Sequence, residues 1–265
     1  MKKAPLLEQR VYSAKHCKDV NLSGKVALVT GGGAGIGRAV SLALGGAGAA
    51  VMVDYLSRKE LAESVAKEIR TLGGKSRVVR ADVSQPRGAK VAVEKTVESF
   101  GRLDILVNNV GSFLHKPILN VESDEWCSVI QSNLNSVFYC SSQAIPQMKK
   151  REWGRVVNIG VAGCDDIRAF PNTTAYNIAK TGVLILSKSL AREVASFGVT
   201  VNVVAPGMVD TGVLSPSAMK EVEKRIPMKR AATCEEIART VMFLVSDDAS
   251  YITGACVTIS GGWLL

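Results

Sequence analysis

From Lys25 onward, short runs of β-branched and apolar residues alternate with longer stretches in which apolar residues recur at helical spacing. The short runs predict buried strands, and the helical spacing predicts helices with one apolar face. The predicted strands are Val26–Thr30, Ala50–Asp54, Ser76–Ala81, Leu103–Asn108, Arg155–Ile159, Thr200–Ala205 and Cys256–Ile259. The predicted helices are Ile36–Gly46, Arg58–Leu72, Gly88–Phe100, Glu122–Lys149, Ala175–Phe197 and Cys234–Ser246.

This alternation of strands and helices is typical of βαβ units, which stack into a parallel sheet. Several of the predicted strands are apolar at nearly every position, as expected where helices cover both faces of the sheet. The sequence therefore predicts an α/β fold with a single doubly wound parallel sheet of seven strands and helices on both faces.

A chain of 265 residues, 47% of them hydrophobic, is long enough for one packed domain and too short for two typical α/β domains. Residues 1–23 show no period and are predicted to form an N-terminal arm before a domain spanning 24–265. The apolar run near Met1 ends almost at once, and charges or glycines interrupt every longer run. Neither a secretory signal nor a membrane span is expected, so we predict a cytoplasmic protein with no membrane partner.

The formal charge of +9 favours anionic partners such as phosphorylated cofactors. The basic residues are dispersed and do not alternate with aromatic residues, so a nucleic-acid partner is not expected. The six cysteines lack the close pairs that zinc sites use, and the two histidines, His16 and His115, are far apart in the sequence. We therefore expect reduced thiols and no metal site.

A run of glycines joins the first predicted strand to the first predicted helix, from Gly31 to Gly37. A dinucleotide needs backbone without Cβ atoms at this place, because amides at a helix N-terminus must approach its pyrophosphate. The run reads Thr30-Gly31-x-x-x-Gly35-Ile36-Gly37 and does not follow the common GxGxxG spacing. A tight turn without a ligand is the alternative, but the position between strand and helix favours a Rossmann-type nucleotide loop. Its predicted cofactor contacts are Gly31, Gly33, Gly35, Ile36 and Gly37.

Further motifs follow in a fixed order between Lys25 and Trp263. They are Asp82-Val83, Asn108-Asn109-Val110-Gly111, Asn133 in Ser132-Asn133-Leu134, Tyr176-Asn177-Ile178-Ala179-Lys180, and Pro206-Gly207-x-Val209-x-Thr211. Together with the glycine loop, this set resembles the short-chain dehydrogenases/reductases. The stretch from Lys180 to Gly207 and the ending Ser260-Gly261-Gly262-Trp263 are most similar to the group of 3-oxoacyl-(acyl-carrier-protein) reductases.

The resemblance implies an oxidoreductase that moves a hydride between NAD(P)(H) and the carbonyl or alcohol of a small-molecule or acyl-carrier-linked substrate. It implies further cofactor contacts at Asp82, Val83, Asn109, Gly111, Tyr176, Lys180, Pro206, Gly207, Val209 and Thr211. It also implies a substrate loop at about 207–230 and a homo-oligomer, either a tetramer or a dimer.

Tyr176, Lys180 and Asn133 are the predicted catalytic residues. Reducing a ketone places negative charge on its oxygen, so an acid must deliver a proton, and Tyr176 is the candidate. Spacing of four residues places Lys180 on the same helix face, where its ammonium would lower the pKa of the phenol. By resemblance, Asn133 holds a water in the proton relay. A Tyr–Lys pair also occurs by chance on many helices, but the ordered motifs favour the catalytic interpretation.

The family usually carries a serine just after the fifth strand, and here Gly160 or Val161 takes its place. Three interpretations remain open. Another group on the following loop supplies the missing hydrogen bond, the candidates being Asp165, Asp166, Thr173 and Thr174. Alternatively, Tyr176 and backbone amides suffice for an activated substrate. In the third, the chain binds nicotinamide without turnover, as a partner subunit or redox sensor.

The end of the second strand gives mixed signals about the cofactor. Asp54 would accept the ribose hydroxyls of NAD(H), whereas Tyr55 in the discriminating position, with Arg58 in reach of a 2′-phosphate, favours NADP(H). Ala34 stands where many NADP-dependent relatives carry a basic residue, which favours NAD(H). We predict that NADP(H) is preferred over NAD(H).

Overall fold

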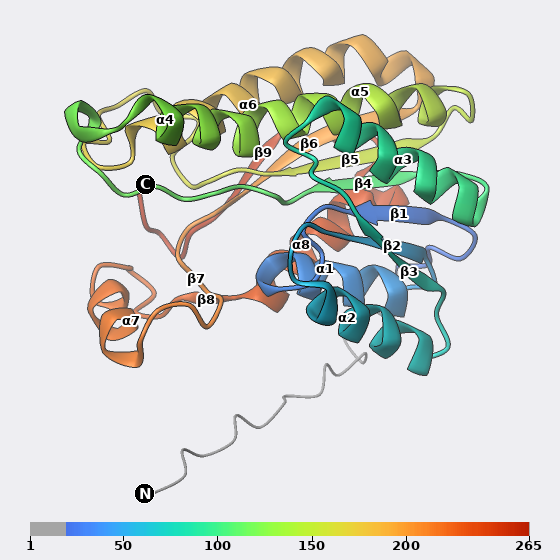
Figure 1. Ribbon diagram of the computed structural model, residues 1–265, viewed down its shortest axis with the longest axis horizontal. Helices are drawn as coiled ribbons and strands as arrows, with labels where there is room; N and C mark the ends of the chain where they lie inside the picture. The colour runs from blue at the N-terminus through green and yellow to red at the C-terminus, as the bar shows by residue number, and fades with distance from the viewer. Residues whose placement is uncertain (1–19, 265) are drawn as a thin grey trace, which may run out of the picture.

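The computed structural model describes residues 20–264, and its centre is one sheet of seven parallel strands (Figure 1). The strand order is β3-β2-β1-β4-β5-β6-β9, so the chain starts near the middle of the sheet and winds outward in both directions. The strands are β1 (Val26–Val29), β2 (Ala50–Tyr55), β3 (Ser76–Arg80), β4 (Ile105–Asn108), β5 (Gly154–Ile159), β6 (Val199–Pro206) and β9 (Cys256–Ile259). The predicted doubly wound sheet is confirmed.

Helices cover both faces of the sheet (Figure 1). One face carries α1 (Gly35–Gly46), α2 (Lys59–Thr71) and α8 (Cys234–Val245); the other carries α3 (Pro86–Phe100), α5 (Ser136–Lys149) and α6 (Thr174–Val194). Consecutive strand residues pack on opposite sides, with Val29 in the cluster under α1 and Leu28 in the cluster under α3. The strands are therefore apolar throughout because both of their faces are buried.

The segment before β1 belongs in part to the domain. Leu22 is buried, and its backbone N–H donates a hydrogen bond to the carbonyl of Ala47. Val20 and Leu22 thus pack against the core, although they fall within the predicted arm, and residues 1–19 of that arm lie outside the described residues.

The helix predicted over 122–149 is divided. It consists of α4 (Ser123–Ile130), a π-helical turn at Gln131–Asn135, and α5. A π turn accommodates one extra residue per turn, so it rotates the following helix relative to the preceding one. The rotation occurs at Asn133, one of the predicted catalytic residues.

The predicted substrate loop contains structure that the sequence pattern did not indicate. Helix α7 (Pro216–Glu223) lies between two short strands, β7 (Val209–Asp210) and β8 (Ala232–Thr233), which pair in parallel. Both ends of the loop are therefore joined by backbone hydrogen bonds. Among residues 20–264, no helix is long and apolar enough to cross a membrane.

Candidate active site

The glycine loop lies at the carboxyl end of β1 and leads into α1. Gly31 and Gly35 have φ angles of +60° and +50°, a region that side chains disfavour. A Cβ on Gly33 would lie 3.0 Å from the backbone nitrogen of Ala62, and one on Gly37 would collide with the carbonyl oxygen of Gly31. The loop therefore depends on glycine at these positions.

The N-terminus of α1 is open to an anion. Its N-cap residue is Ala34, no side chain caps it, and its first turn carries no acidic residue. The first amides of a helix have no partner within the helix, and together with the helix dipole they favour a phosphate group. The residues present thus fit the pyrophosphate of a dinucleotide.

Asn109 holds the glycine loop in place. Its side-chain amide donates to the carbonyls of Thr30 and Gly31 at 3.0 and 3.3 Å, and its backbone N–H donates to the Thr30 hydroxyl at 2.9 Å. These contacts make Asn109 a positioning residue for the loop, and its cofactor contact stays a prediction.

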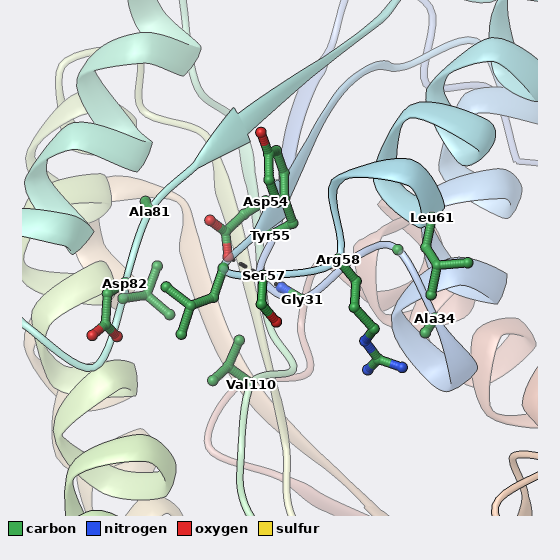
Figure 2. A pocket seen from close by; sticks show the side chains of 13 residues that line it. Gly31, Ala34, Asp54, Tyr55, Ser57, Arg58, Leu61, Ala81, Asp82 and Val110 are labelled. Atoms are coloured by element: carbon green, nitrogen blue, oxygen red, sulfur yellow. Dashed lines mark hydrogen bonds between the residues drawn. The ribbon is translucent and has the colours of Figure 1, made fainter.

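Beside the glycine loop, the ends of β2 and β3 enclose a cavity of about 180 Å³ (Figure 2). Seven predicted cofactor residues line it: Gly31, Gly33, Asp54, Tyr55, Arg58, Asp82 and Val83. The sequence did not single out four further lining residues, which are Leu56, Ser57, Leu61 and Ala81, and Val110 of the Asn-Asn-Val-Gly motif also lines the cavity. A cavity between the second and third strands suits an adenosine group, which needs apolar walls and a few polar contacts.

Asp54 and Arg58 differ in their access to this cavity. The Asp54 side chain is buried and accepts a hydrogen bond of 3.2 Å from the N–H of Gly31, and within the described part of the chain its Oδ1 has no partner. Burial raises the pKa of Asp54 to about 7. Arg58 is exposed, and Figure 2 shows its guanidinium on the opposite side of the cavity from the Asp54 carboxyl. A carboxyl with this pKa is partly neutral at neutral pH, so it repels a nearby phosphate only weakly.

The segment after β6 lies on the other side of the glycine loop. The N–H of Gly207 donates to the carbonyl of Ile259, and the N–H of Ala162 donates to the carbonyl of Pro206, both at 2.8 Å. A Cβ on Gly35 would lie 3.5 Å from the methyl group of Thr211. Thr211 therefore lies beside the glycine loop, and the cofactor contacts of Pro206, Gly207, Val209 and Thr211 stay predictions.

Tyr176 and Lys180 lie one turn apart near the start of α6. The Nζ atom of Lys180 is 5.7 Å from the centre of the Tyr176 ring and donates a hydrogen bond of 2.6 Å to the carbonyl of Ile159. Burial lowers the pKa of Lys180 to about 8 and raises the pKa of Tyr176 to about 12. The predicted proximity is present, but the predicted lowering of the phenol pKa is wrong for this structure, because burial dominates.

Asn133 and Gly111 lie beside Lys180. The side-chain amide of Asn133 donates to the carbonyls of Ser112 and Val129 at 2.8 and 3.0 Å, while its buried Oδ1 has no partner among residues 20–264. A Cβ on Gly111 would collide with Oδ1 of Asn133 and lie 3.4 Å from Nζ of Lys180. The π turn thus aims an unsatisfied acceptor at the space that Gly111 leaves open.

The two residues in place of the usual serine differ in their surroundings. A Cβ on Gly160 would lie 2.7 Å from a methyl group of Val203, inside the core. Val161 is half-buried and packs against the apolar cluster of Cys164, Leu184, Val203 and Ala205. Position 160 therefore has no room for a side chain without a shift of Val203, so the space favours position 161 as the predicted equivalent of the serine.

The four polar residues considered as replacements for that serine have other neighbours. The Thr173 hydroxyl accepts from the Asn177 amide, and the Thr174 hydroxyl donates to the carbonyl of Phe170, both at 2.8 Å. Asp166 lies 3.5 Å from Arg168, and Asp165 lies beside Cys164 and Cys256.

Phe113 is a site residue that the sequence reasoning missed. Its ring packs edge-on against the Tyr176 ring at 5.1 Å between centroids, although 65% of its side chain is exposed. It follows the Asn-Asn-Val-Gly motif by two positions. A residue so soon after the end of a strand could have been predicted to lie at the site.

The comparisons with known proteins agree with this geometry. A family model described as enoyl-(acyl carrier protein) reductase matches residues 31–264. The chain is 40% identical to the 3-oxoacyl-(acyl-carrier-protein) reductase FabG of Staphylococcus aureus over 245 residues, which are 90% of this chain and 97% of that protein. A 3-oxoacyl-(acyl-carrier-protein) reductase of Synechocystis is 37% identical over 246 residues, covering 92% and 98%.

Solved structures show the same likeness. A short-chain dehydrogenase/reductase mutant of Serratia marcescens has a TM-score of 0.86 and 34% identity, covering 92% of this chain and 99% of that one. A structure described as a putative short-chain alcohol dehydrogenase from Sinorhizobium meliloti has a TM-score of 0.86 and 31% identity, covering 92% and 98%. The chain therefore belongs to the short-chain dehydrogenase/reductase family and is a nicotinamide-dependent oxidoreductase.

Proposed function

We propose that this enzyme reduces the carbonyl of an apolar or acyl-linked substrate with NADP(H), and that Tyr176 donates the proton. The observation that carries the proposal is the grouping of Tyr176, Lys180 and the orphaned Oδ1 of Asn133 at the carboxyl edge of the sheet. The nicotinamide supplies the hydride when it is bound. The 3-oxoacyl-(acyl-carrier-protein) reductases among the relatives support an acyl-type substrate.

In this proposal, the Tyr176 hydroxyl donates a hydrogen bond to the carbonyl oxygen and gives up its proton as negative charge develops there. The resulting phenolate needs a nearby positive charge, which the protonated form of Lys180 provides at 5.7 Å from the ring centre. The free Oδ1 of Asn133 accepts from a water that returns a proton to this pair. Because Val161 offers no hydroxyl, Tyr176 and backbone amides orient the substrate.

Exposed apolar side chains on the loops at the carboxyl edge of the sheet support an apolar substrate. These loops follow β4, β5 and β6, and the side chains include Phe113, Leu119, Ile167, Val213 and Met228. Of these, Phe113 packs against the Tyr176 ring. Some of this surface lies on the predicted substrate loop, and an acyl chain would cover it.

The preference for NADP(H) is supported by the exposed guanidinium of Arg58 and by the partly neutral Asp54.

Assembly into a dimer or tetramer stays a prediction, which light scattering would test directly.

The test is an assay of 3-oxoacyl thioesters and small ketones, following nicotinamide absorbance in the wild type and in Tyr176→Phe. We expect kcat to fall about 10²- to 10⁴-fold in the variant, while the cofactor still binds. Tyr139→Phe, on α5 and outside the site, is the matched control and keeps full activity. Equal activity in wild type and Tyr176→Phe would refute the proton-donor role. Tight cofactor binding without turnover on any carbonyl would instead favour the noncatalytic alternative.

A further inference from the structure

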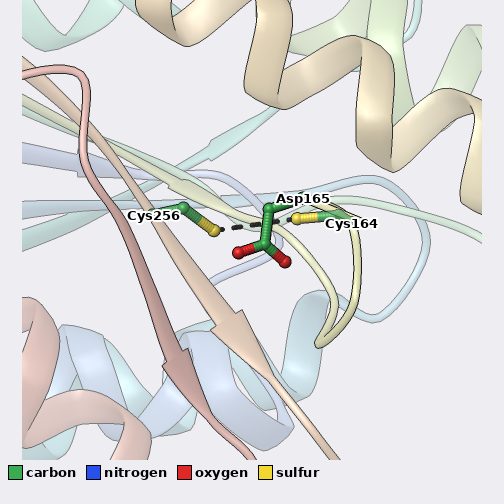
Figure 3. Close-up of side chains that lie close together, drawn as sticks. All are labelled: Cys164, Asp165 and Cys256. Carbon is green, nitrogen blue, oxygen red and sulfur yellow. Dashed lines mark hydrogen bonds between the residues drawn. The ribbon is translucent and has the colours of Figure 1, made fainter. Parts of the chain in front are cut away.

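Two cysteines that are distant in the sequence meet beside β6. Cys164 follows β5, and Cys256 begins β9 opposite Val203 of β6. Their sulfur atoms are 3.8 Å apart, and a carboxylate oxygen of Asp165 completes a group of three ligand atoms that all lie within 4.8 Å of one another. Figure 3 shows the two sulfurs facing each other with the Asp165 carboxyl alongside. The wide sequence separation explains why the spacing gave no indication of a metal site.

We propose that Cys164, Cys256 and Asp165 form a binding site for a thiophilic divalent cation, of which Zn²⁺ is the expected one. Zn²⁺ binds thiolates at about 2.3 Å with tetrahedral geometry, which places two thiolate sulfurs about 3.8 Å apart. The observed sulfur separation matches this spacing without movement of the backbone. One carboxylate oxygen is the third ligand, and a water takes the fourth position.

The surroundings leave these three groups available. Among residues 20–264, the Asp165 carboxylate has no hydrogen bond or ion pair with a side chain or backbone group, and the side chain is exposed. Cys256 is half-buried and Cys164 is buried, so a cation enters from the Asp165 side and meets Cys164 last. This graded burial gives the site an entry path and a protected inner ligand.

Metal binding requires deprotonated thiols, so a cation that binds between the two sulfurs displaces the protons that they carry. The charged groups near the pair are Asp165, which is the third proposed ligand, and Lys188 and Lys180.

The site is coupled to the catalytic helix. The hydroxyl of Thr181 on α6 donates to the carbonyl oxygen of Cys164 at 3.1 Å, and a charge on Cys164 raises the pKa values of both Tyr176 and Lys180. A cation would fix the loop after β5 to β9 and neutralise this charge. The binding itself does not depend on the proposed function and is measured without turnover.

Co²⁺ is a suitable probe because its thiolate complexes absorb in the near ultraviolet through charge transfer. Under a phosphine reductant, the wild type is expected to bind one equivalent and to show this band, and Zn²⁺ is expected to abolish the band by competition and to raise Tm. Cys256→Ser is expected to lose the band, and Asp165→Asn to bind at least about tenfold more weakly. Cys127→Ser, which removes an exposed thiol on α4, keeps the band.

Cys164→Ser changes a buried residue, so Cys256→Ser and Asp165→Asn carry the test if that variant does not fold. The absence of a charge-transfer band in the reduced wild type would overturn the proposal. An unchanged band in Cys256→Ser would also overturn it, because the cobalt would then be bound elsewhere.

Discussion

Lys180 approaches Tyr176 to within 5.7 Å of the ring centre while its ammonium donates a hydrogen bond to the carbonyl of Ile159. Burial acts on the two residues in opposite directions, since it lowers the pKa of the amine and raises the pKa of the phenol. The phenol therefore keeps its proton over the whole neutral range. Of the two residues, only Lys180 changes its charge close to neutral pH.

The rate of reduction is expected to fall on the alkaline side with a midpoint near the Lys180 pKa of about 8. Lys180 carries its charge below that pKa and loses it above, so the stabilisation of the phenolate is lost as pH rises. The measurement is kcat against pH with saturating NADPH. Lys180→Arg keeps its charge and should lose the alkaline decline, even at a lower maximal rate. A flat profile for the wild type up to about pH 9.5 would contradict this role.

Arg58→Ala is expected to raise the KM for NADPH about 10- to 100-fold, because a charge-assisted hydrogen bond to phosphate contributes about 1.5–3 kcal/mol. NADH has no 2′-phosphate, so its KM should stay within about twofold. Steady-state kinetics with both cofactors measure the effect. Arg77→Ala removes another exposed arginine, on β3 and outside the cofactor cavity, and serves as the control. Equal losses with both cofactors would show that Arg58 does not contact the 2′-phosphate.

Val161→Ser should raise kcat/KM by about tenfold or more, since one oriented donor at a developing oxyanion contributes about 2 kcal/mol or more. Gly160→Ser is the contrasting variant and should lower the free energy of unfolding, because its Cβ would lie 2.7 Å from Val203. Kinetics and urea unfolding separate the two effects. A gain in activity at position 160 and none at 161 would reverse the assignment of the serine position.

The Asp54 carboxyl makes the stability depend on pH. Its pKa rises from 3.8 to about 7 on burial, so between these values the folded chain holds a proton that the unfolded chain has lost. Stability is therefore lost as pH rises through this window, by up to about 4 kcal/mol in total. Urea unfolding between about pH 5 and about pH 8.5 should show a shallower decline for Asp54→Asn than for the wild type. The exposed Asp248→Asn should follow the wild type, and parallel curves for all three proteins would contradict the effect.

The sheet and most helices could be predicted because their signal is local. Strand Gly154–Ile159 is buried at every position, and the helix at Lys59–Thr71 buries one regular face, so each pattern shows directly in the sequence. The glycine loop and the Tyr176–Lys180 pair could also be predicted from the sequence. The glycine loop is recognised by its place between a strand and a helix, and the pair by its spacing of four residues within one helix.

The features that could not be predicted depend on contacts between distant segments. The two-residue strands β7 and β8 are too short for any alternation to be visible. The π turn at Asn133 adds one residue inside a stretch of 28 residues that was predicted as one continuous helix over 122–149, and helical spacing alone did not reveal so local a change. The raised pKa of Tyr176 reflects burial by the folded chain, and the meeting of Cys164 with Cys256 reflects the strand order. Only Ser215-Pro216, an N-cap followed by proline, signalled the missed α7.

The short pairing of β7 with β8 separates the predicted substrate loop from the strands and helices of the main domain. Val209 pairs with Ala232, so the segment between β7 and β8 leaves and rejoins the domain at one short parallel pair. Changes within residues 212–225 would alter the surface offered to a substrate and would leave Thr211 beside Gly35 of the glycine loop. Changes confined to this one segment could in this way alter which carbonyl compounds the fold accepts.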